Sequence, residues 1–412
     1  MTHNYSTFFK SLDASFIFLV LFLISLPILE ALKNIFLVLF FLSWLISSRR
    51  DASLRVGWDS TDTIFLMLIL GIFIVTSHAY FFLGEAIDGI RDFIKFVIVG
   101  WLVSRTRFNS KQIYILFISL IIGTVLGLLH TYYYLGCQSE TCIELNSVGH
   151  VNHSAIFIVM VLSLCLSLMT IKFDKYDLGK KLLLLFLSFF FLKAILDGQS
   201  RAALLMALTI VLLWFAYISL RSKSKLSFIL GFFAVTILLG TIIYNSSETI
   251  KKFSNGIDLC VSCDPSNSPR QRIRNFSYYL FLESPYFGHG FKNFANYNLD
   301  DIQEIVTTKE GYFDRSKFEN SPHPHNIYYF YLTGGGIFMF TIFMLFWIRA
   351  LWIVFKLIKL NKGNYLVFNS LNVIMTMLII GMVNTTFEHE NALLSIFIIA
   401  LAMSEYRFIK LS

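Results

Sequence analysis

The sequence has few charged residues for a chain of its length. Asp, Glu, Lys and Arg make up 15% of its 412 residues, against about 25% in soluble proteins. Hydrophobic residues make up 56% and the mean hydropathy is +0.67. This composition excludes a compact soluble enzyme, a disordered chain and a collagen-like repeat. It predicts an all-α, polytopic integral membrane protein.

Cysteine is scarce, and motifs for nucleotide binding are absent. Five cysteines are too few for a disulfide scaffold, although Cys137 and Cys142, and Cys260 and Cys263, form close pairs. Structural disulfides are favoured for both pairs, because a zinc site would need two further ligands. Cys165 lies in a predicted span and is interpreted as a packing residue. No Walker loop, Rossmann fingerprint or DxD motif occurs, and we expect no cofactor.

Apolar runs long enough to cross a bilayer, about 20 residues each, cover most of the chain. The run from Phe16 lacks a small-residue cleavage site after it and is interpreted as the first span rather than a signal peptide. The sequence predicts about twelve transmembrane helices: 14–32, 35–48, 62–83, 91–104, 112–135, 153–172, 182–197, 202–220, 226–244, 326–348, 365–385 and 391–406.

The net charge of +8 comes from short basic clusters between the spans. Such clusters indicate membrane orientation rather than a nucleic-acid partner. With the N-terminus inside, the inner segments hold 20 Lys and Arg residues, whereas the short outer loops hold only Lys33, Arg91 and Arg201. This bias predicts that both termini are cytoplasmic and that the chain contacts membrane lipids along its spans.

One outer loop of 81 residues, 245–325, is far longer than the others and holds five of the six prolines. Within it, 270–283 has helical apolar spacing ended by Pro285, and a weaker helix is predicted over 294–307. Long structured loops usually carry function. The chain is thereby divided into transmembrane helices 1–9 over 1–244, the partly helical loop over 245–325, and transmembrane helices 10–12 over 326–412.

Arginines gather at two places on the outer face. Arg201 opens the eighth span directly after Gln199 and Ser200, where a helix N-terminus also presents free N–H groups, and this pattern suits a phosphate group. Three more alternate at the start of the loop helix: Arg270, Arg272 and Arg274. Their planar forks suit a pyrophosphate. The alternative interpretation of Arg201 is an interfacial anchor, and that of the three loop arginines is a solvated helix face.

Two histidines stand where the large loop re-enters the membrane, in Ser321-Pro322-His323-Pro324-His325-Asn326. A histidine that titrates near neutrality is a candidate general base for a hydroxyl. As alternatives, the two histidines could be part of a metal site or simply interfacial residues. A metal site would need a third ligand, and no carboxylate or histidine has matching local spacing. Pro324 is expected to make the two rings point apart. The glycines at 334–336 are interpreted as a place of close helix approach.

In these residues the chain resembles the bacterial O-antigen ligases, polytopic glycosyltransferases that join O-antigen to lipid A–core. Gln199-Ser200-Arg201-Ala202 is similar to the family's arginine at the start of a span. Arg270 ahead of Pro285-Tyr286-Phe287-Gly288 is similar to its loop arginine, although Arg272 competes for that position. His325-Asn326, with Gly336 ten residues after Asn326, is similar to its H-N-x9-G element, while Met339 departs from the Gly, Thr or Tyr that often follows.

The resemblance implies transfer of a polysaccharide from undecaprenyl pyrophosphate to lipid A–core, in the periplasm at the inner membrane of a Gram-negative bacterium. It implies that Arg201 and Arg270 or Arg272 hold the pyrophosphate and that His325 is the base of an inverting, metal-independent reaction. Further substrate contacts are expected from Arg274, Asn326, His323, Gln199 and Ser200.

Three other functions fit the same pattern. O-antigen polymerases and protein O-oligosaccharyltransferases belong to the same superfamily, and the short motifs separate them poorly. A flippase for lipid-linked sugars would also be polytopic and basic. Flippases tend to carry charge along a central cavity, whereas the charge here gathers at one outer face, which favours an enzyme.

Overall fold

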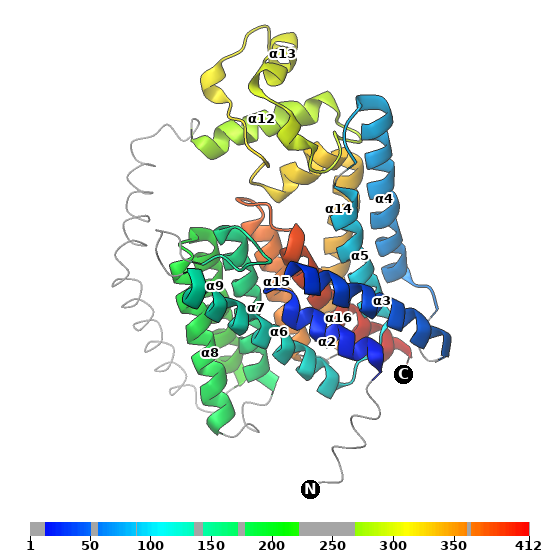
Figure 1. Ribbon diagram of the computed structural model, residues 1–412, viewed down its shortest axis with the longest axis vertical. Helices are drawn as coiled ribbons and strands as arrows, with labels where there is room; N and C mark the ends of the chain where they lie inside the picture. The colour runs from blue at the N-terminus through cyan, green and yellow to red at the C-terminus, as the bar shows by residue number, and fades with distance from the viewer. Residues whose placement is uncertain are drawn as a thin grey trace.

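The computed structural model describes residues 13–50, 57–87, 89–135, 143–171, 178–221, 268–360 and 364–411. Within these ranges the chain is 81% helical and contains no strand (Figure 1). The expected all-α class is therefore confirmed. The two cysteine pairs and the predicted span at 226–244 lie outside the described residues.

The helices follow one another from the N-terminus as α2 (Ala14–Ser25), α3 (Glu30–Arg50), α4 (Ser60–Leu83), α5 (Ile90–Arg105), α6 (Ser110–His130), η2 (Thr131–Leu135), α7 (Val151–Ile171), α8 (Leu178–Asp197) and α9 (Arg201–Arg221). After the loop entry come α12 (Pro269–Glu283), η4 (Asn293–Asn296), α13 (Leu299–Glu310), η5 (Arg315–Lys317), α14 (Ile327–Lys359), α15 (Asn364–Ile380) and α16 (His389–Leu411).

Seven of the described helices are long and apolar enough to cross a membrane: α3, α4, α6, α7, α9, α14 and α16. The helices α2 and α15 are apolar but shorter, and α5 and α8 coincide with predicted spans. A helix therefore stands at every predicted span that falls in the described residues, and the protein is a multi-pass membrane protein.

The first predicted span, 14–32, is wrong in its boundary. Helix α2 ends at Ser25, and the turn that follows contains Pro27, which has no N–H to continue the helical ladder. Helix α3 already begins at Glu30 and packs against α2. Lys33, expected in a short outer loop, therefore lies in the first turn of α3 and is only 3% exposed.

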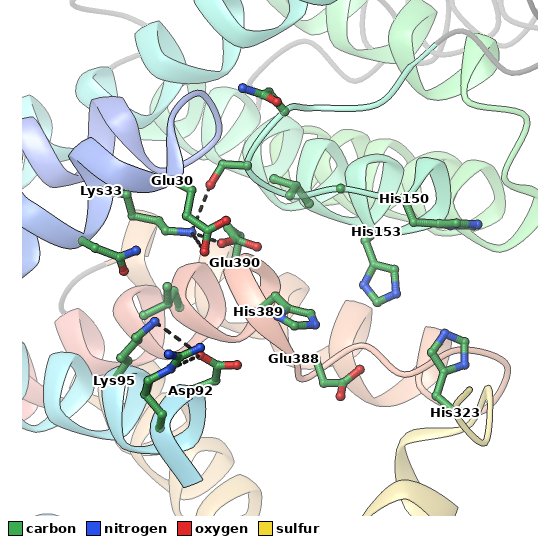
Figure 2. A pocket seen from close by; sticks show the side chains of 17 residues that line it. Glu30, Lys33, Asp92, Lys95, His150, His153, His323, Glu388, His389 and Glu390 are labelled. Atoms are coloured by element: carbon green, nitrogen blue, oxygen red, sulfur yellow. Dashed lines mark hydrogen bonds and ion pairs between the residues drawn. The ribbon is translucent and has the colours of Figure 1, made fainter. Parts of the chain in front are cut away.

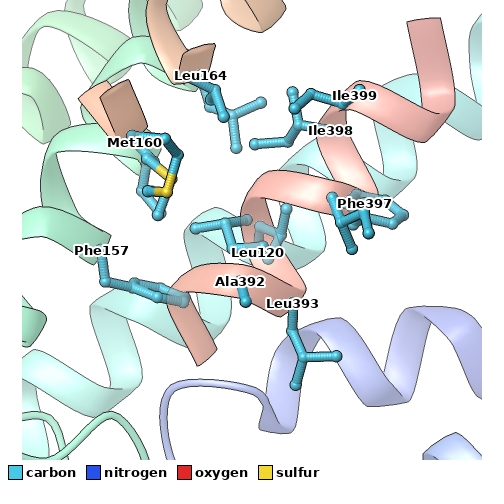
Figure 3. Packing of buried hydrophobic residues seen from close by; sticks show 14 of the residues in the cluster. Leu120, Phe157, Met160, Leu164, Ala392, Leu393, Phe397, Ile398 and Ile399 are labelled. Atoms are coloured by element: carbon cyan, nitrogen blue, oxygen red, sulfur yellow. The ribbon is translucent and has the colours of Figure 1, made fainter. Parts of the chain in front are cut away.

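The centre of the membrane part is formed by α7 packed against α16. Figure 3 shows Phe157 of α7 beside Ala392 of α16, and Leu164 of α7 beside Ile398 and Ile399 of α16, all within one buried cluster. Helix α7 is apolar all round, which is the pattern of a helix enclosed by others. Cys165 of α7 is buried, as its interpretation as a packing residue predicted.

The described part of the long loop folds as a small unit beyond one end of the bundle, predicted to be the extracytoplasmic end (Figure 1). Helix α12 matches the helix predicted over 270–283. The second helix was predicted from 294 but begins at Leu299, because Asn298 caps it by accepting from the amides of Asp300 and Asp301. The unit has an apolar cluster of its own: Phe276, Leu280, Phe294, Ile302, Val306 and Phe318.

The unit is fixed to the bundle through the glycine run of α14. Four backbone hydrogen bonds join the turn at 285–290 to this run: His289 N to Thr333 O (2.8 Å), Gly290 N to Gly334 O (2.9 Å), Ile337 N to Pro285 O (2.8 Å) and Phe338 N to Tyr286 O (3.1 Å). Gly336 has φ 60° and interrupts the regular helix. The predicted close approach at 334–336 is thus made by the loop turn, because backbone docks on backbone there.

Replacing Gly336 by Ala is expected to loosen this attachment. A Cβ at Gly336 would lie 2.3 Å from the carbonyl carbon of Tyr286, and its backbone conformation alone costs a non-glycine residue about 1–3 kcal/mol. We expect a lower unfolding temperature and faster proteolysis within 268–326. Gly311→Ala is the control, since Gly311 also has positive φ but nothing within 4 Å. Equal effects of both changes would assign the loss to backbone strain alone.

Candidate functional site

Three segments that are distant in sequence meet at the end of the bundle that carries the loop unit. They are the start of α9 at Arg201, the start of α12 at Arg270, and the residues before α14, which contain His325. Arg270 lies close enough to Arg201 and to Arg274 for their charges to lower its pKa, and its own charge acts on His325. The structure therefore brings together residues that were singled out separately in the sequence.

The arginines of this group have no counter-ion in the described part of the chain. No hydrogen bond or ion pair joins Arg201, Arg270 or Arg274 to a carboxylate there, and all three side chains are exposed. Partial desolvation is the main cause that lowers the pKa of Arg270, followed by the charges of Arg201 and Arg274. Like charges that converge without a carboxylate suit an anion with several oxygens.

Arg272 has a different environment from Arg270, although the two residues are close in sequence. Its Nε and Nη2 atoms lie 3.0 and 2.7 Å from one carboxylate oxygen of Glu319. This ion pair ties α12 to the chain that leads to His325. Of the two arginines that compete for the loop position, the geometry favours Arg270 as the one free to meet an anion.

The backbone before α9 presents Arg201 to the site. Gln199 adopts φ 49°, and the carbonyl of the buried Ser200 accepts the first helical hydrogen bond, from Leu204 N at 2.9 Å. The nearby carboxylate of Asp197 is occupied by Lys193 and by the hydroxyl of Tyr132. Asp197 therefore leaves the charge of Arg201 uncompensated.

The rings of His323 and His325 lie against each other, with centroids 4.0 Å apart and planes at 87°. The expectation that they point apart is wrong, because His325 takes φ 48° and turns the chain back. Burial, followed by His323, Arg270 and His150, lowers the pKa of His325 to about 4. Neutral pH lies well above this pKa, so the imidazole of His325 is uncharged there.

Asn326 caps α14. Its side-chain oxygen accepts from the amides of Tyr328 (2.9 Å) and Tyr329 (3.1 Å), and its amide donates to Met382 O (2.9 Å). These contacts fix the start of α14 beside His325 and tie it to the turn before α16. Substrate contact by Asn326 stays a prediction.

A cavity of about 490 Å³ opens beside His323. Its described lining includes His150 and His153 at the start of α7, and Glu388 and His389 at the start of α16. Figure 2 shows these side chains around one side of the cavity, with His323 entering from the segment before α14. The cavity is polar and lies next to the candidate base, as a binding site for a hydroxyl-bearing substrate requires.

A buried ion pair forms the opposite wall of this cavity (Figure 2). Lys33 is paired with Glu390 and donates to Ser147 Oγ at 3.0 Å. Both charged side chains are at most 7% exposed. Because removal of one partner from such a pair leaves an uncompensated buried charge, this contact locks α3, α16 and the 143–149 segment together around the cavity.

Backbone strain is concentrated at the same place. In the described part of the chain, four residues other than glycine have positive φ: Gln199, Lys292, His325 and His389. Three of them belong to the site or to its cavity. Such conformations cost about 1–3 kcal/mol and persist where the surrounding structure enforces them, often at functional sites.

Comparison with protein families gives one match. Residues 183–344 match the sequence pattern of the O-antigen ligase family. This range includes Arg201, Arg270 and His325, the three residues that meet at the site. This match supports the resemblance to the O-antigen ligase family over residues 183–344. A search of curated proteins found no match to the chain.

The match to the O-antigen ligase family supports an enzyme of the ligase or polymerase type with glycosyltransferase-like activity. The family also implies a lipid-linked polysaccharide and lipid A–core as substrates in a membrane. The expectation drawn from the short motifs of the sequence is confirmed at this level.

Four residues that line the cavity of the candidate site were missed by sequence reasoning: His150, His153, Glu388 and His389. Each stands at the outer end of a predicted span, just before or within its first turn. Ionisable residues at membrane depth are functional candidates by default. The repeated placement of histidine at outer helix ends is the signal that would have found them.

Proposed function

We propose that the protein moves O-antigen polysaccharide from undecaprenyl pyrophosphate to a sugar hydroxyl of lipid A–core, at the periplasmic face of the inner membrane. The observation that carries this proposal is the group of uncompensated arginines, Arg201, Arg270 and Arg274, next to the neutral imidazole of His325. An anion site beside a proton acceptor is what displacement of a pyrophosphate by a hydroxyl requires.

In this proposal Arg201 and Arg270 bind the pyrophosphate of the donor. Guanidinium forks donate two hydrogen bonds at once to phosphate oxygens, and the N-terminus of α9 adds its free N–H groups after Gln199 and Ser200. Negative charge grows on the pyrophosphate as the bond to the sugar breaks. The arginines stabilise that charge, so the leaving group needs no metal ion or cofactor to neutralise it.

His325 acts as the general base. Its neutral imidazole takes the proton of the acceptor hydroxyl while the hydroxyl oxygen attacks the anomeric carbon of the donor sugar. The new glycosidic bond forms as the bond to the pyrophosphate oxygen breaks, which inverts the anomeric configuration. Undecaprenyl pyrophosphate leaves with the electron pair of that bond.

The histidine-lined cavity is proposed as the place where the acceptor sugar binds. His323 lies both on the cavity wall and against the ring of His325. A hydroxyl held by the polar lining, which includes His150 and Glu388, would reach the base from that side. Donor and acceptor then approach His325 from different sides, as a transfer in one displacement requires.

The topology is proposed from the basic bias: both termini cytoplasmic and the unit at 268–326 periplasmic. In a cysteine-free background, a thiol reagent that cannot cross the inner membrane should label Ala295→Cys in intact spheroplasts. Lys359→Cys, at the inner end of α14, should be labelled only after lysis. Ala295 and Lys359 are both exposed, and neither caps a helix. The reverse labelling pattern would refute this topology.

The function itself is tested by the lipopolysaccharide of a deletion strain. Loss of a ligase leaves the lipid A–core bare while polymer accumulates on undecaprenyl pyrophosphate. Loss of a polymerase leaves cores that carry a single repeat unit, and loss of a flippase prevents periplasmic polymer altogether. Only the first pattern supports the proposal, and its restoration by the intact gene is the control.

A further inference from the structure

A second pocket lies on the extracytoplasmic unit, away from the arginines and histidines of the ligase site. It has a volume of about 270 Å³, close to the lower end of small-molecule sites at roughly 300 Å³. The residues that matter for its chemistry come from α12, α13 and the segment after α13: Asn275, Tyr278, Tyr279, Glu310, Tyr312 and Asp314.

Two aromatic rings of this pocket, Tyr278 and Tyr312, are exposed and lie outside the apolar cluster of the unit, whereas Tyr279 packs against that cluster. The side chains of Tyr278 and Tyr312 are 44% and 62% exposed. Tyr279 is half-buried, packs on Phe318 at 5.7 Å and stands perpendicular to Tyr278 at 5.4 Å. Large rings that stay in water on a small folded unit indicate a binding surface.

The polar groups beside these rings are held in place before any ligand arrives. The hydroxyl of Tyr279 donates to Glu310, and burial together with Glu310 raises the pKa of Tyr279 to about 12. Asp314 accepts from the amide and the hydroxyl of Ser316, at 3.1 and 2.7 Å. Asn275 donates to Lys317 O at 3.0 Å. Each carboxylate keeps further lone pairs for donors of a ligand.

Aromatic faces beside fixed carboxylates match the chemistry of a sugar ring. The C–H face of a pyranose packs against an aromatic ring, and its hydroxyls donate to carboxylate oxygens. The one cation of the described lining, Lys317, is paired with Asp314 at 3.7 Å, so a nucleotide or a lipid phosphate would meet the negative charge of Glu310. A neutral carbohydrate is therefore the ligand class that this pocket fits.

We propose that this pocket binds the polysaccharide portion of the lipid-linked donor, at sugars remote from the reacting end. The inference rests on the proposed function. Helix α12 carries Arg270 in its first turn and Tyr278 eight residues on, roughly 12 Å along its axis at 1.5 Å per residue. A polymer whose pyrophosphate lies on Arg270 can follow α12 outward. The acceptor cavity, by contrast, is lined by α7 and α16.

Direct binding tests the pocket without any transfer reaction. The probe is the delipidated O-polysaccharide released by mild acid from the lipopolysaccharide of the same bacterium, titrated onto the detergent-solubilised protein. Tyr278→Ala combined with Tyr312→Ala should weaken binding roughly tenfold, the change that a loss of 1.4 kcal/mol produces. Tyr133→Ala, which removes an 81% exposed ring from η2, directly after α6, is the matched control and should bind as the unchanged protein does.

Transfer kinetics then distinguish the donor from the acceptor as occupant. With a donor that carries a long polymer, the double variant should raise KM for the donor about tenfold and keep kcat. With a donor that carries one repeat unit, its KM should not change. Equal effects on both donors, a raised KM for lipid A–core, or unchanged binding of the free polysaccharide would overturn the proposal. Absence of transfer by the unchanged protein would refute the proposed function but leave the binding result standing.

Discussion

Arg201→Ala and Arg270→Ala should each lower the rate of polysaccharide transfer by about 100- to 1,000-fold, the effect of removing one donor from a developing oxyanion, or about 2.7–4 kcal/mol. The two arginines lie together without a carboxylate in the described part of the chain, so their charges are available to the pyrophosphate of the donor. Both side chains are exposed, and insertion and folding should persist. Transfer in proteoliposomes with purified donor and acceptor measures the effect.

Two further variants separate a reacting arginine from a structural one. Arg201→Lys should restore only part of the rate, because an ammonium group lacks the planar fork. Arg272→Ala breaks the ion pair with Glu319 and should loosen α12 against the segment before His325, with a smaller loss of rate. If Arg272→Ala were as inactive as Arg270→Ala in a well-folded protein, the loop arginine of the site would be Arg272.

The parts of the fold that follow from local sequence were predicted well. A span needs only an apolar run, and α12 needs only helical spacing, a capping Ser268 and Pro269 in its first turn. The boundary near Pro27 was misplaced because apolar residues continue on both sides of the turn there. The missing N–H of one proline does not change a hydropathy profile, but it interrupts the ladder of backbone hydrogen bonds in a helix.

The parts of the site that depend on tertiary contact were not predictable in the same way. Sequence marked Arg201, Arg270 and His325 as separate candidates, but their approach depends on how the turn at 285–290 docks on the glycines of α14. The ion pair of Lys33 with Glu390 joins residues from opposite ends of the chain. The histidine cavity is likewise assembled from five segments, so its lining has no local spacing to detect.

Replacing His325 by Ala should lower the transfer rate by about 100- to 10,000-fold, the usual contribution of a general base. The ring lies outside the membrane spans, and its loss should leave insertion intact. His323→Ala should be less severe, yet it should not be silent, because the rings of His323 and His325 are in contact. Full activity of His325→Ala would return both histidines to the role of interfacial residues.

The pH dependence of transfer identifies which histidine titrates in the reaction. A general base works only when deprotonated, so the rate should fall as the pH drops through its pKa. The pKa of His325 is lowered to about 4, whereas an unperturbed histidine titrates near about 6.5. The rate should therefore stay level from about pH 8 to 5 and decline only below that. His323→Ala removes the second-largest cause of the lowered pKa, after burial, and should move the acidic limb of the pH profile to higher pH.

Activity should persist in EDTA, because arginines neutralise the leaving group in this mechanism. Loss of activity in EDTA that a divalent ion restores would replace the base by a metal site at His323 and His325.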